Sequence, residues 1–140
     1  MSSRDLNDLH PIIRAKCQAH IDACKAAGID LLITCTYRTP AEQDALYAQG
    51  RAHPGPIVTN AKAGQSMHQY RLAYDCVPLV NGKAVWNTTG TDGQMWHKIG
   101  ELGKAQGLEW GEDWVGFHEM PHFQFTGGHP LAFFEAGGQL

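Results

Sequence analysis

His68, Asp75 and His122 are residue types that can bind a zinc ion together. Two imidazole nitrogens and one carboxylate oxygen form a ligand set that leaves a fourth position open for water. Zinc lowers the pKa of such a water to about 7, so the water can act as a nucleophile at neutral pH. Glu119 lies three residues before His122 and could accept the proton of that water. These residues therefore predict a metal-assisted hydrolase.

Asp75 supports this interpretation because its neighbours in the sequence are apolar. Leu72, Ala73, Cys76 and Val77 surround it. Burying an unpaired carboxylate is costly, so a cation, either a metal ion or an arginine, should face Asp75. The spacing of the three residues is less compact than a His-Glu-x-x-His helix, and a single histidine is more often a surface or hydrogen-bonding residue. The metal prediction therefore depends on the elements that position the residues.

Apolar periodicity, helix caps and turn residues predict those elements. The expected helices cover residues 11–27, 39–49 and 91–106, and the expected strands cover 31–37, 72–80, 83–86, 108–110 and 122–125. Thr39, Pro40 and Glu42 form a strong helix start, and Asn81-Gly82 predicts a hairpin turn. This order predicts an α+β domain with a small, mainly antiparallel sheet and helices packed around it.

These elements also suggest how the three ligands could meet. A long loop over residues 51–65 precedes His68, and loops of this length are often functional. If His68 ends that loop and Asp75 lies on the following strand, the two can flank one point. His122 would reach the same point from a neighbouring strand.

Bulk properties restrict the partners and the location of the chain. Its 140 residues fit one domain, and a net charge of −3 argues against nucleic acid as a partner. No apolar run approaches the ~18 residues of a membrane span, so no stable membrane association is expected. The N-terminus lacks a signal-peptide layout, which predicts synthesis in the cytoplasm. Four cysteines without Cys-x-x-Cys spacing are interpreted as reduced, buried residues, with a disulfide or a cysteine metal site as the alternative.

The segment 66–75, SMHQYRLAYD, resembles the Ser-x-His-x-x-Gly-x-Ala-x-Asp signature of the VanY-type D-Ala-D-Ala metallopeptidases. Segments over 50–62, 107–114 and 121–123 resemble the phage endolysin branch of that family, which includes L-alanyl-D-glutamate peptidases. The resemblance spans roughly residues 31–125 in the right order. It implies a hedgehog/D-Ala-D-Ala peptidase-like fold in which a zinc site lies in a surface cleft.

The resemblance also implies roles for individual residues. It implies Zn²⁺ held by His68, Asp75 and His122, with Glu119 as the catalytic carboxylate. It implies that Arg38 faces the cleft, where it could bind a substrate carboxylate or the developing oxyanion. The alternative for Arg38 is a structural ion pair with Glu42 or Asp44.

Four further residues are predicted to bind substrate. Ser66 could hydrogen-bond substrate or a ligand, although a local turn bond is equally compatible. Trp114 and Phe117 are the aromatic residues expected to wall the cleft. Arg71 replaces the glycine of the family signature, and we expect an ordinary backbone there with a side chain that pairs with a stem-peptide carboxylate. Asp113 is interpreted as a partner of a metal-binding histidine or as a loop cap.

These expectations combine into an endolysin that cleaves the L-alanyl-D-glutamate bond of peptidoglycan stem peptides. A D-Ala-D-Ala carboxypeptidase is the alternative within the same chemistry, and a non-catalytic zinc-containing wall-binding protein is the alternative outside it. We expect one zinc peptidase domain over residues 1–140, without a separate wall-binding domain, acting as a monomer. Made in the host cytoplasm and acting on the cell wall in the periplasm, it would need a holin for access.

Overall fold

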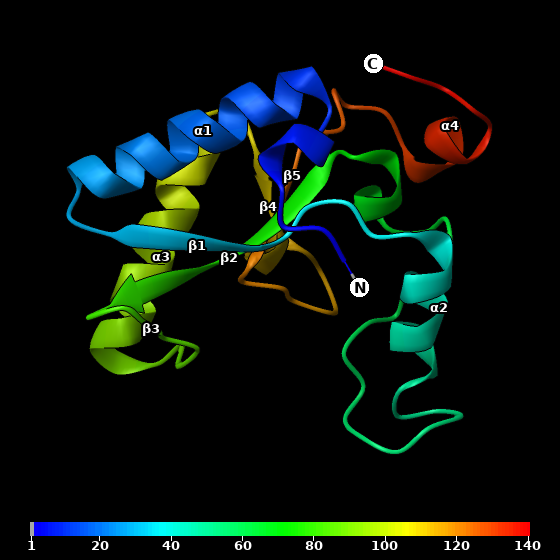
Figure 1. The fold of residues 1–140 in the computed structure, drawn as a ribbon, viewed down its shortest axis with the longest axis horizontal. Coiled ribbons are helices and arrows are strands. Elements are labelled where there is room, and N and C mark those ends of the chain that lie inside the picture. The colour runs from blue at the N-terminus through cyan, green and yellow to red at the C-terminus, as the bar shows by residue number, and fades with distance from the viewer. Residues whose placement is uncertain (1) are drawn as a thin grey trace.

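The expected helices and strands form in the expected order, with small shifts at their ends. The computed structural model describes residues 2–140 (Figure 1). Its helices are α1 (Pro11–Ala26), α2 (Pro40–Ala48), α3 (Gly90–Lys104) and α4 (Leu131–Glu135), and its strands are β1 (Asp30–Cys35), β2 (Ala73–Val80), β3 (Lys83–Ala84), β4 (Glu109–Trp110) and β5 (His122–Gln124). Short 3-10 helices are η1 (Leu6–Asp8), η2 (Met67–Tyr70) and η3 (Gly111–Asp113). The α+β prediction is confirmed.

All strand pairs of the sheet are antiparallel. The strands lie in the order β1-β2-β5-β4, and β3 pairs with the end of β2. The predicted turn between β2 and β3 is confirmed: Asn81 and Gly82 have φ values of 53° and 75°, which is the backbone that a tight hairpin turn requires.

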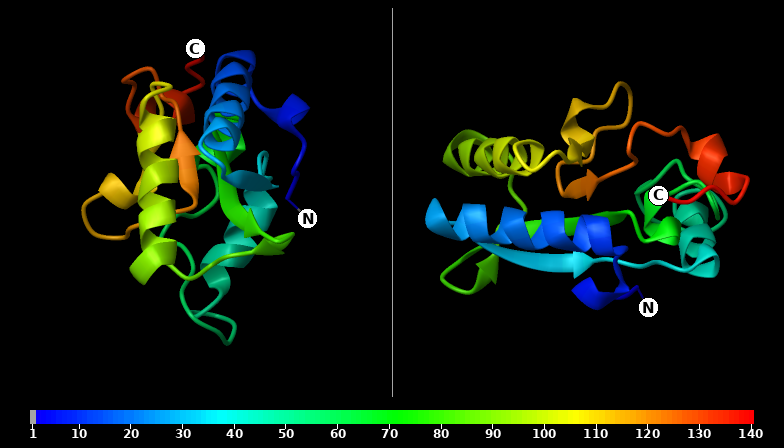
Figure 2. Two further views of the ribbon diagram at one scale, coloured as in Figure 1. Left: turned by 90° about the vertical axis from the view of Figure 1, so that its left-hand side faces the viewer. Right: turned by 90° about the horizontal axis from the view of Figure 1, so that it is seen from above.

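Helices α1 and α3 cover one face of the sheet (Figures 1 and 2). Ile13, Cys17, His20 and Cys24 of α1 are fully buried at helical spacing. Glycines let α3 approach closely, because a Cβ at Gly103 would lie 2.5 Å from the Phe123 ring. The core between helices and sheet is therefore built from both helices and from the strand residues that point toward them.

Three cysteines, Cys17, Cys24 and Cys76, belong to this core, whereas Cys35 is buried on the other face beside His68. All four are free and buried. Burial raises the pKa of the Cys17 thiol to about 12 and that of the Cys24 thiol to about 11. Both therefore stay protonated at neutral pH and act as small apolar residues.

The opposite face of the sheet and its far end carry the cleft. Helix α2 and the loop that follows it extend beyond the end of β1, and the C-terminal segment with α4 lies above them (Figure 1). Thr39 and Glu42 form the predicted capping box of α2. Between residues 2 and 140, no helix is long and apolar enough to cross a membrane.

Candidate active site

Three side chains form a row across neighbouring strands on the side of the sheet away from α1 and α3. The register pairs Cys35 of β1 with Asp75 of β2, and Asp75 with His122 of β5. Directly paired residues point to the same face, whereas the next residues along, Tyr74 and Phe123, point into the helix-covered core. Strand alternation therefore separates the core from the functional row.

His68 reaches the same place from η2, which the sequence did not predict. Ser66 accepts a hydrogen bond from the His68 N–H at 3.3 Å, and the Gln69 side chain accepts from the Ser66 N–H at 3.1 Å. This capping box forms the 3-10 turn. The turn ends at Arg71, whose φ of 63° reverses the chain into β2. His68 is therefore held on a short turn directly before the strand that carries Asp75.

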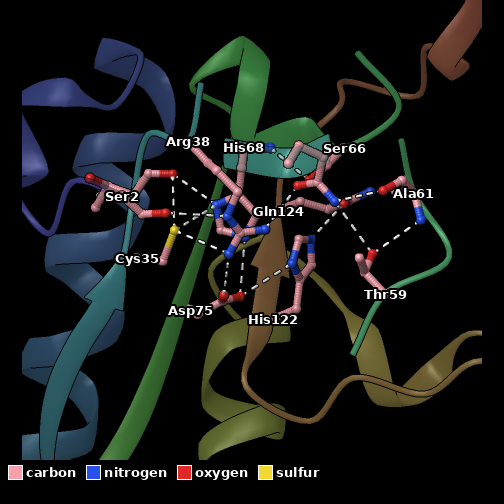
Figure 3. A network of polar contacts seen from close by, with 12 residues as sticks. Ser2, Cys35, Arg38, Thr59, Ala61, Ser66, His68, Asp75, His122 and Gln124 are labelled. Carbon is pink, nitrogen blue, oxygen red and sulfur yellow. Dashed lines mark hydrogen bonds and ion pairs between the residues drawn. The ribbon is translucent and has the colours of Figure 1, made fainter. Parts of the chain in front are cut away.

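Figure 3 shows both imidazoles directed at the Asp75 carboxylate. Asp75 Oδ1 lies 3.2 Å from His68 Nε2 and 3.3 Å from His122 Nδ1. The side chains of the two histidines are only 2% and 6% exposed, whereas that of Asp75 is 22% exposed. The structure thus brings together all three predicted ligands.

The second nitrogen of each imidazole has a different partner. His68 Nδ1 lies 2.8 Å from the Thr36 carbonyl oxygen, and His122 Nε2 lies 2.8 Å from Gln124 Oε1. Both partners are oxygen acceptors, so each receives an N–H, and in the neutral ring the other nitrogen then has a lone pair. The nitrogens left free for a metal are therefore His68 Nε2 and His122 Nδ1.

Cys35, His68 and Asp75 also offer possible ligand atoms, all within 4.8 Å of one another. Arg38 occupies that side of the site: its Nη2 lies 3.4 Å from Cys35 Sγ and 3.6 Å from Asp75 Oδ2. A guanidinium repels a metal ion, and His68 Nδ1 already bonds the Thr36 carbonyl. The geometry therefore favours a metal on the His122 side of Asp75. Two nitrogens and one carboxylate oxygen there suit zinc.

The charges of the site are strongly coupled. Burial alone would raise the pKa of Asp75 and lower that of His68. The attraction between the two groups outweighs burial, so the pKa of Asp75 falls well below its usual range and that of His68 rises to about 10. A metal ion would replace the proton on His68 Nε2 as the cation facing Asp75.

Glu119 lies beside this metal site on the loop between η3 and β5. Its backbone is fixed on both sides: its N–H donates to the Gly111 carbonyl at 3.1 Å, and its carbonyl accepts from the His122 N–H at 3.2 Å. Any Cβ at Gly111 would collide with that Glu119 carbonyl oxygen. Burial raises the pKa of the Glu119 carboxyl above its ordinary value, against the opposing effect of His122. A raised pKa is the direction that a proton-exchanging carboxyl requires.

The cleft runs across the metal site. One hollow contains Arg38, Ser66 and Trp114 together with His68, and a second contains Val58, Phe117 and Asp75. Both hollows share Glu119 and His122. The predicted substrate-binding residues Ser66, Trp114 and Phe117 therefore line the cleft, although the Ser66 hydroxyl also makes the local cap bond.

Arg38 lies in the cleft but does not form the ion pair with Glu42 or Asp44 considered above. Its guanidinium donates to Gln43 Oε1 at 3.0 Å and pairs with Asp75. Gln43 is fully buried, and its amide also donates to the Ala61 carbonyl at 2.8 Å. A hydrogen-bonded network thus connects Arg38 to the loop that borders the cleft.

Two expectations are corrected by the geometry. Arg71 has a left-handed backbone, not an ordinary one, and its side chain turns away from the cleft. It bonds the Asp8 carbonyl at 3.0 Å and lies 4.1 Å over the Tyr37 ring. Asp113 pairs with Lys104 at 3.0 Å and is exposed. Asp113 is therefore not the hydrogen-bond partner of His68 or His122, whose outer ring nitrogens face Thr36 and Gln124.

Residues 59–125 match the family described as D-alanyl-D-alanine carboxypeptidase. The chain is 39% identical over 123 residues to the peptidoglycan L-alanyl-D-glutamate endopeptidase CwlK of Bacillus subtilis (strain 168), covering 84% of this chain and 74% of that protein. It is 32% identical to the L-alanyl-D-glutamate peptidase of Listeria phage A118, over 89% of this chain and 41% of the phage protein.

Solved structures agree on the fold. The vancomycin-resistance D,D-pentapeptidase VanY from the VanB-type cassette, in complex with Zn(II), has a TM-score of 0.64 at 18% identity, covering 91% of this chain and 78% of that chain. Identity at this level supports the fold alone. With the extended match to CwlK, the chain belongs to the D-alanyl-D-alanine carboxypeptidase family of peptidases, as the sequence resemblance predicted.

Proposed function

We propose that this protein is a zinc peptidase that cleaves the L-alanyl-D-glutamate bond of peptidoglycan stem peptides. The observation that carries the proposal is the convergence of His68 Nε2 and His122 Nδ1 on Asp75 Oδ1, at 3.2 and 3.3 Å, in the cleft that contains Glu119. These atoms would hold the ion. When bound, zinc polarises the substrate carbonyl and makes water nucleophilic at neutral pH.

Glu119 would accept the proton of the attacking water and deliver it to the leaving amine. Partial burial raises the pKa of this carboxyl, and a raised pKa favours a group that must both accept and release a proton. The presence of this carboxylate beside the ligands argues against a purely zinc-holding, wall-binding protein.

Arg38 would bind the anionic part of the substrate. The D-glutamyl residue carries a free carboxylate close to the scissile bond, and Arg38 is the only arginine or lysine among the residues that line the two hollows described above. A charge-assisted contact to that carboxylate, or to the oxyanion, would orient the scissile bond over the metal site. Ser66, Trp114 and Phe117 would supply the remaining walls.

An endopeptidase fits the cleft better than a carboxypeptidase. An endopeptidase must accommodate chain on both sides of the scissile bond, and two hollows share Glu119 and His122. The curated relatives quoted above are both L-alanyl-D-glutamate peptidases by name, which supports the same choice. D-Ala-D-Ala cleavage is the second candidate, supported by the description of the matching family.

The setting follows from the substrate. We propose that residues 1–140 form one peptidase domain that acts as a monomer on the periplasmic cell wall after synthesis in the host cytoplasm. A holin would give it access to the wall without binding it. The relationship to a phage peptidase supports this endolysin role.

Mass spectrometry of digested sacculi tests the choice of bond. We expect zinc-loaded protein to release stem peptides that begin with D-glutamate and to leave L-alanine on the muramyl residue. Loss of a single terminal D-alanine, with the rest of the stem intact, would instead identify a D-Ala-D-Ala carboxypeptidase.

A further inference from the structure

Gln124 is a site residue that the sequence patterns do not mark. It lies two residues after His122 on β5, so both side chains project from the same face of the strand. Figure 3 shows the Gln124 amide against the imidazole of His122, and Gln124 Oε1 lies 2.8 Å from His122 Nε2. The amide therefore contacts the imidazole nitrogen that faces away from Asp75.

The residue opposite Gln124 on the neighbouring strand is Glu109, and its carboxylate has a hydrogen-bond partner of its own. The Glu109 carboxylate is engaged elsewhere, because its Oε2 accepts from Thr126 Oγ1 at 2.7 Å and from the Thr126 N–H at 3.2 Å. Oε2 of Glu109 is therefore occupied by Thr126.

The two metal-facing histidines are thus oriented by different means. The partner of His68 is the backbone carbonyl of Thr36, whereas the partner of His122 is a side chain. Only the second can be removed by substitution. An amide oxygen accepts but never donates, so it selects the form of His122 that carries its proton on Nε2.

We propose that Gln124 is the positioning residue of the metal site: it fixes the ring and tautomer of His122 so that the Nδ1 lone pair points at the metal. This inference rests on the proposed function only for the identity of the ligands. Gln124 acts through His122 and is not itself a catalytic residue.

Zinc affinity, measured by competition with a chromogenic chelator, tests the proposal without using activity. Removing an acceptor of this kind typically weakens metal binding by about 10- to 100-fold, and we expect Gln124→Met to do so. Gln124→Asn should bind zinc as weakly as Gln124→Met, because the shorter side chain does not bring its amide oxygen to His122 Nε2. Gln124→Glu should bind at least as tightly as wild type, since it keeps both reach and acceptor. Gln94→Met, an exposed change on α3, is the matched control.

A double-mutant cycle separates this role from general damage to the fold. In a His122→Ala background, Gln124→Met should cause no further loss of zinc affinity. Nitrogen NMR of zinc-loaded wild type should show His122 bound through Nδ1 with its proton on Nε2. The proposal is overturned if Gln124→Met binds zinc as tightly as wild type, or if Gln124→Glu binds zinc as weakly as Gln124→Met. It is also overturned if Gln124→Met lowers zinc affinity further in the His122→Ala background. Normal zinc binding without hydrolysis would overturn the proposed function instead.

Discussion

Arg38 places a positive charge directly beside the metal ligands. Its Nη2 is 3.6 Å from Asp75 Oδ2, yet it remains among the residues that line the cleft. Arg71, the other arginine singled out in the sequence, points to Asp8 on a different side of the molecule. Of these two arginines, only Arg38 lines the cleft.

Replacing Arg38 should reduce turnover without removing the metal. We expect Arg38→Met to lower kcat/KM for a stem peptide by about 100-fold, the usual cost of losing one donor to a developing oxyanion. Zinc affinity should persist because all three ligands remain. Arg71→Met is the matched control and should leave kcat/KM unchanged. Steady-state kinetics and zinc titrations of both variants measure these two quantities. Full activity of Arg38→Met would contradict a role of Arg38 in turnover.

For single residues, the sequence identifies which side chains can carry chemistry but not where those side chains point. His68, Asp75, His122 and Glu119 were recognisable because their types carry chemistry. The Thr36 carbonyl was not, since every residue has one, and Gln124 has no pattern of its own. The direction of Arg71 follows from its left-handed backbone at the end of η2. The glycine that the family signature has at this position was the available signal, because glycine adopts positive φ most readily.

At the scale of elements, the contact between α1 and the sheet contains a titratable group. His20 is fully buried, with Nδ1 2.6 Å from the Tyr74 hydroxyl and Nε2 2.8 Å from the Ile99 carbonyl. The carbonyl accepts from Nε2–H, so the hydroxyl donates to Nδ1 and the imidazole is satisfied in its neutral form. Burial lowers the pKa of His20 below its ordinary value, against the opposing hydrogen bond to Ile99.

This burial makes stability depend on pH. Below the unfolded pKa of about 6.5, the unfolded chain binds a proton that folded His20 refuses, so the free energy of unfolding falls as pH falls. The contribution is complete above that pKa and declines by at most about 1.4 kcal/mol per pH unit until the folded pKa is reached. Urea unfolding at pH 7.5 and 5.5 should show a smaller pH-dependent loss for His20→Gln than for wild type. An equal loss in both proteins would contradict this role.

The elements that define the core were predictable, and those that define the site were less so. Helix α1 and the β2–β3 hairpin have strong caps, turns and apolar spacing, so their signals agree with the tertiary structure. Helix η2 is a single short turn, and α4 is a five-residue helix followed by glycines. Both are too short for apolar periodicity to indicate a helix. They pack on each other through Tyr70 of η2 and Phe134 of α4, a tertiary contact that the local sequence does not predict.

In the whole molecule, the two faces of one sheet have different roles. The helix-covered face contains the core, and the other face with its bordering loops contains the metal site and the cleft. Two hollows that share Glu119 and His122 form the cleft on that face. The alternation of β2 and β5 fixes both faces at once, which explains why a short chain can hold a rigid site.

Glu119 is proposed to transfer the proton during hydrolysis at a zinc site built from His68, Asp75 and His122. The most direct test is the digestion rate of purified sacculi by zinc-loaded wild type and Glu119→Ala, with bound zinc measured in both. The account predicts equal zinc content and a rate at least about 100-fold lower for Glu119→Ala, the scale of general acid–base catalysis. Equal rates for the two zinc-loaded proteins would contradict it.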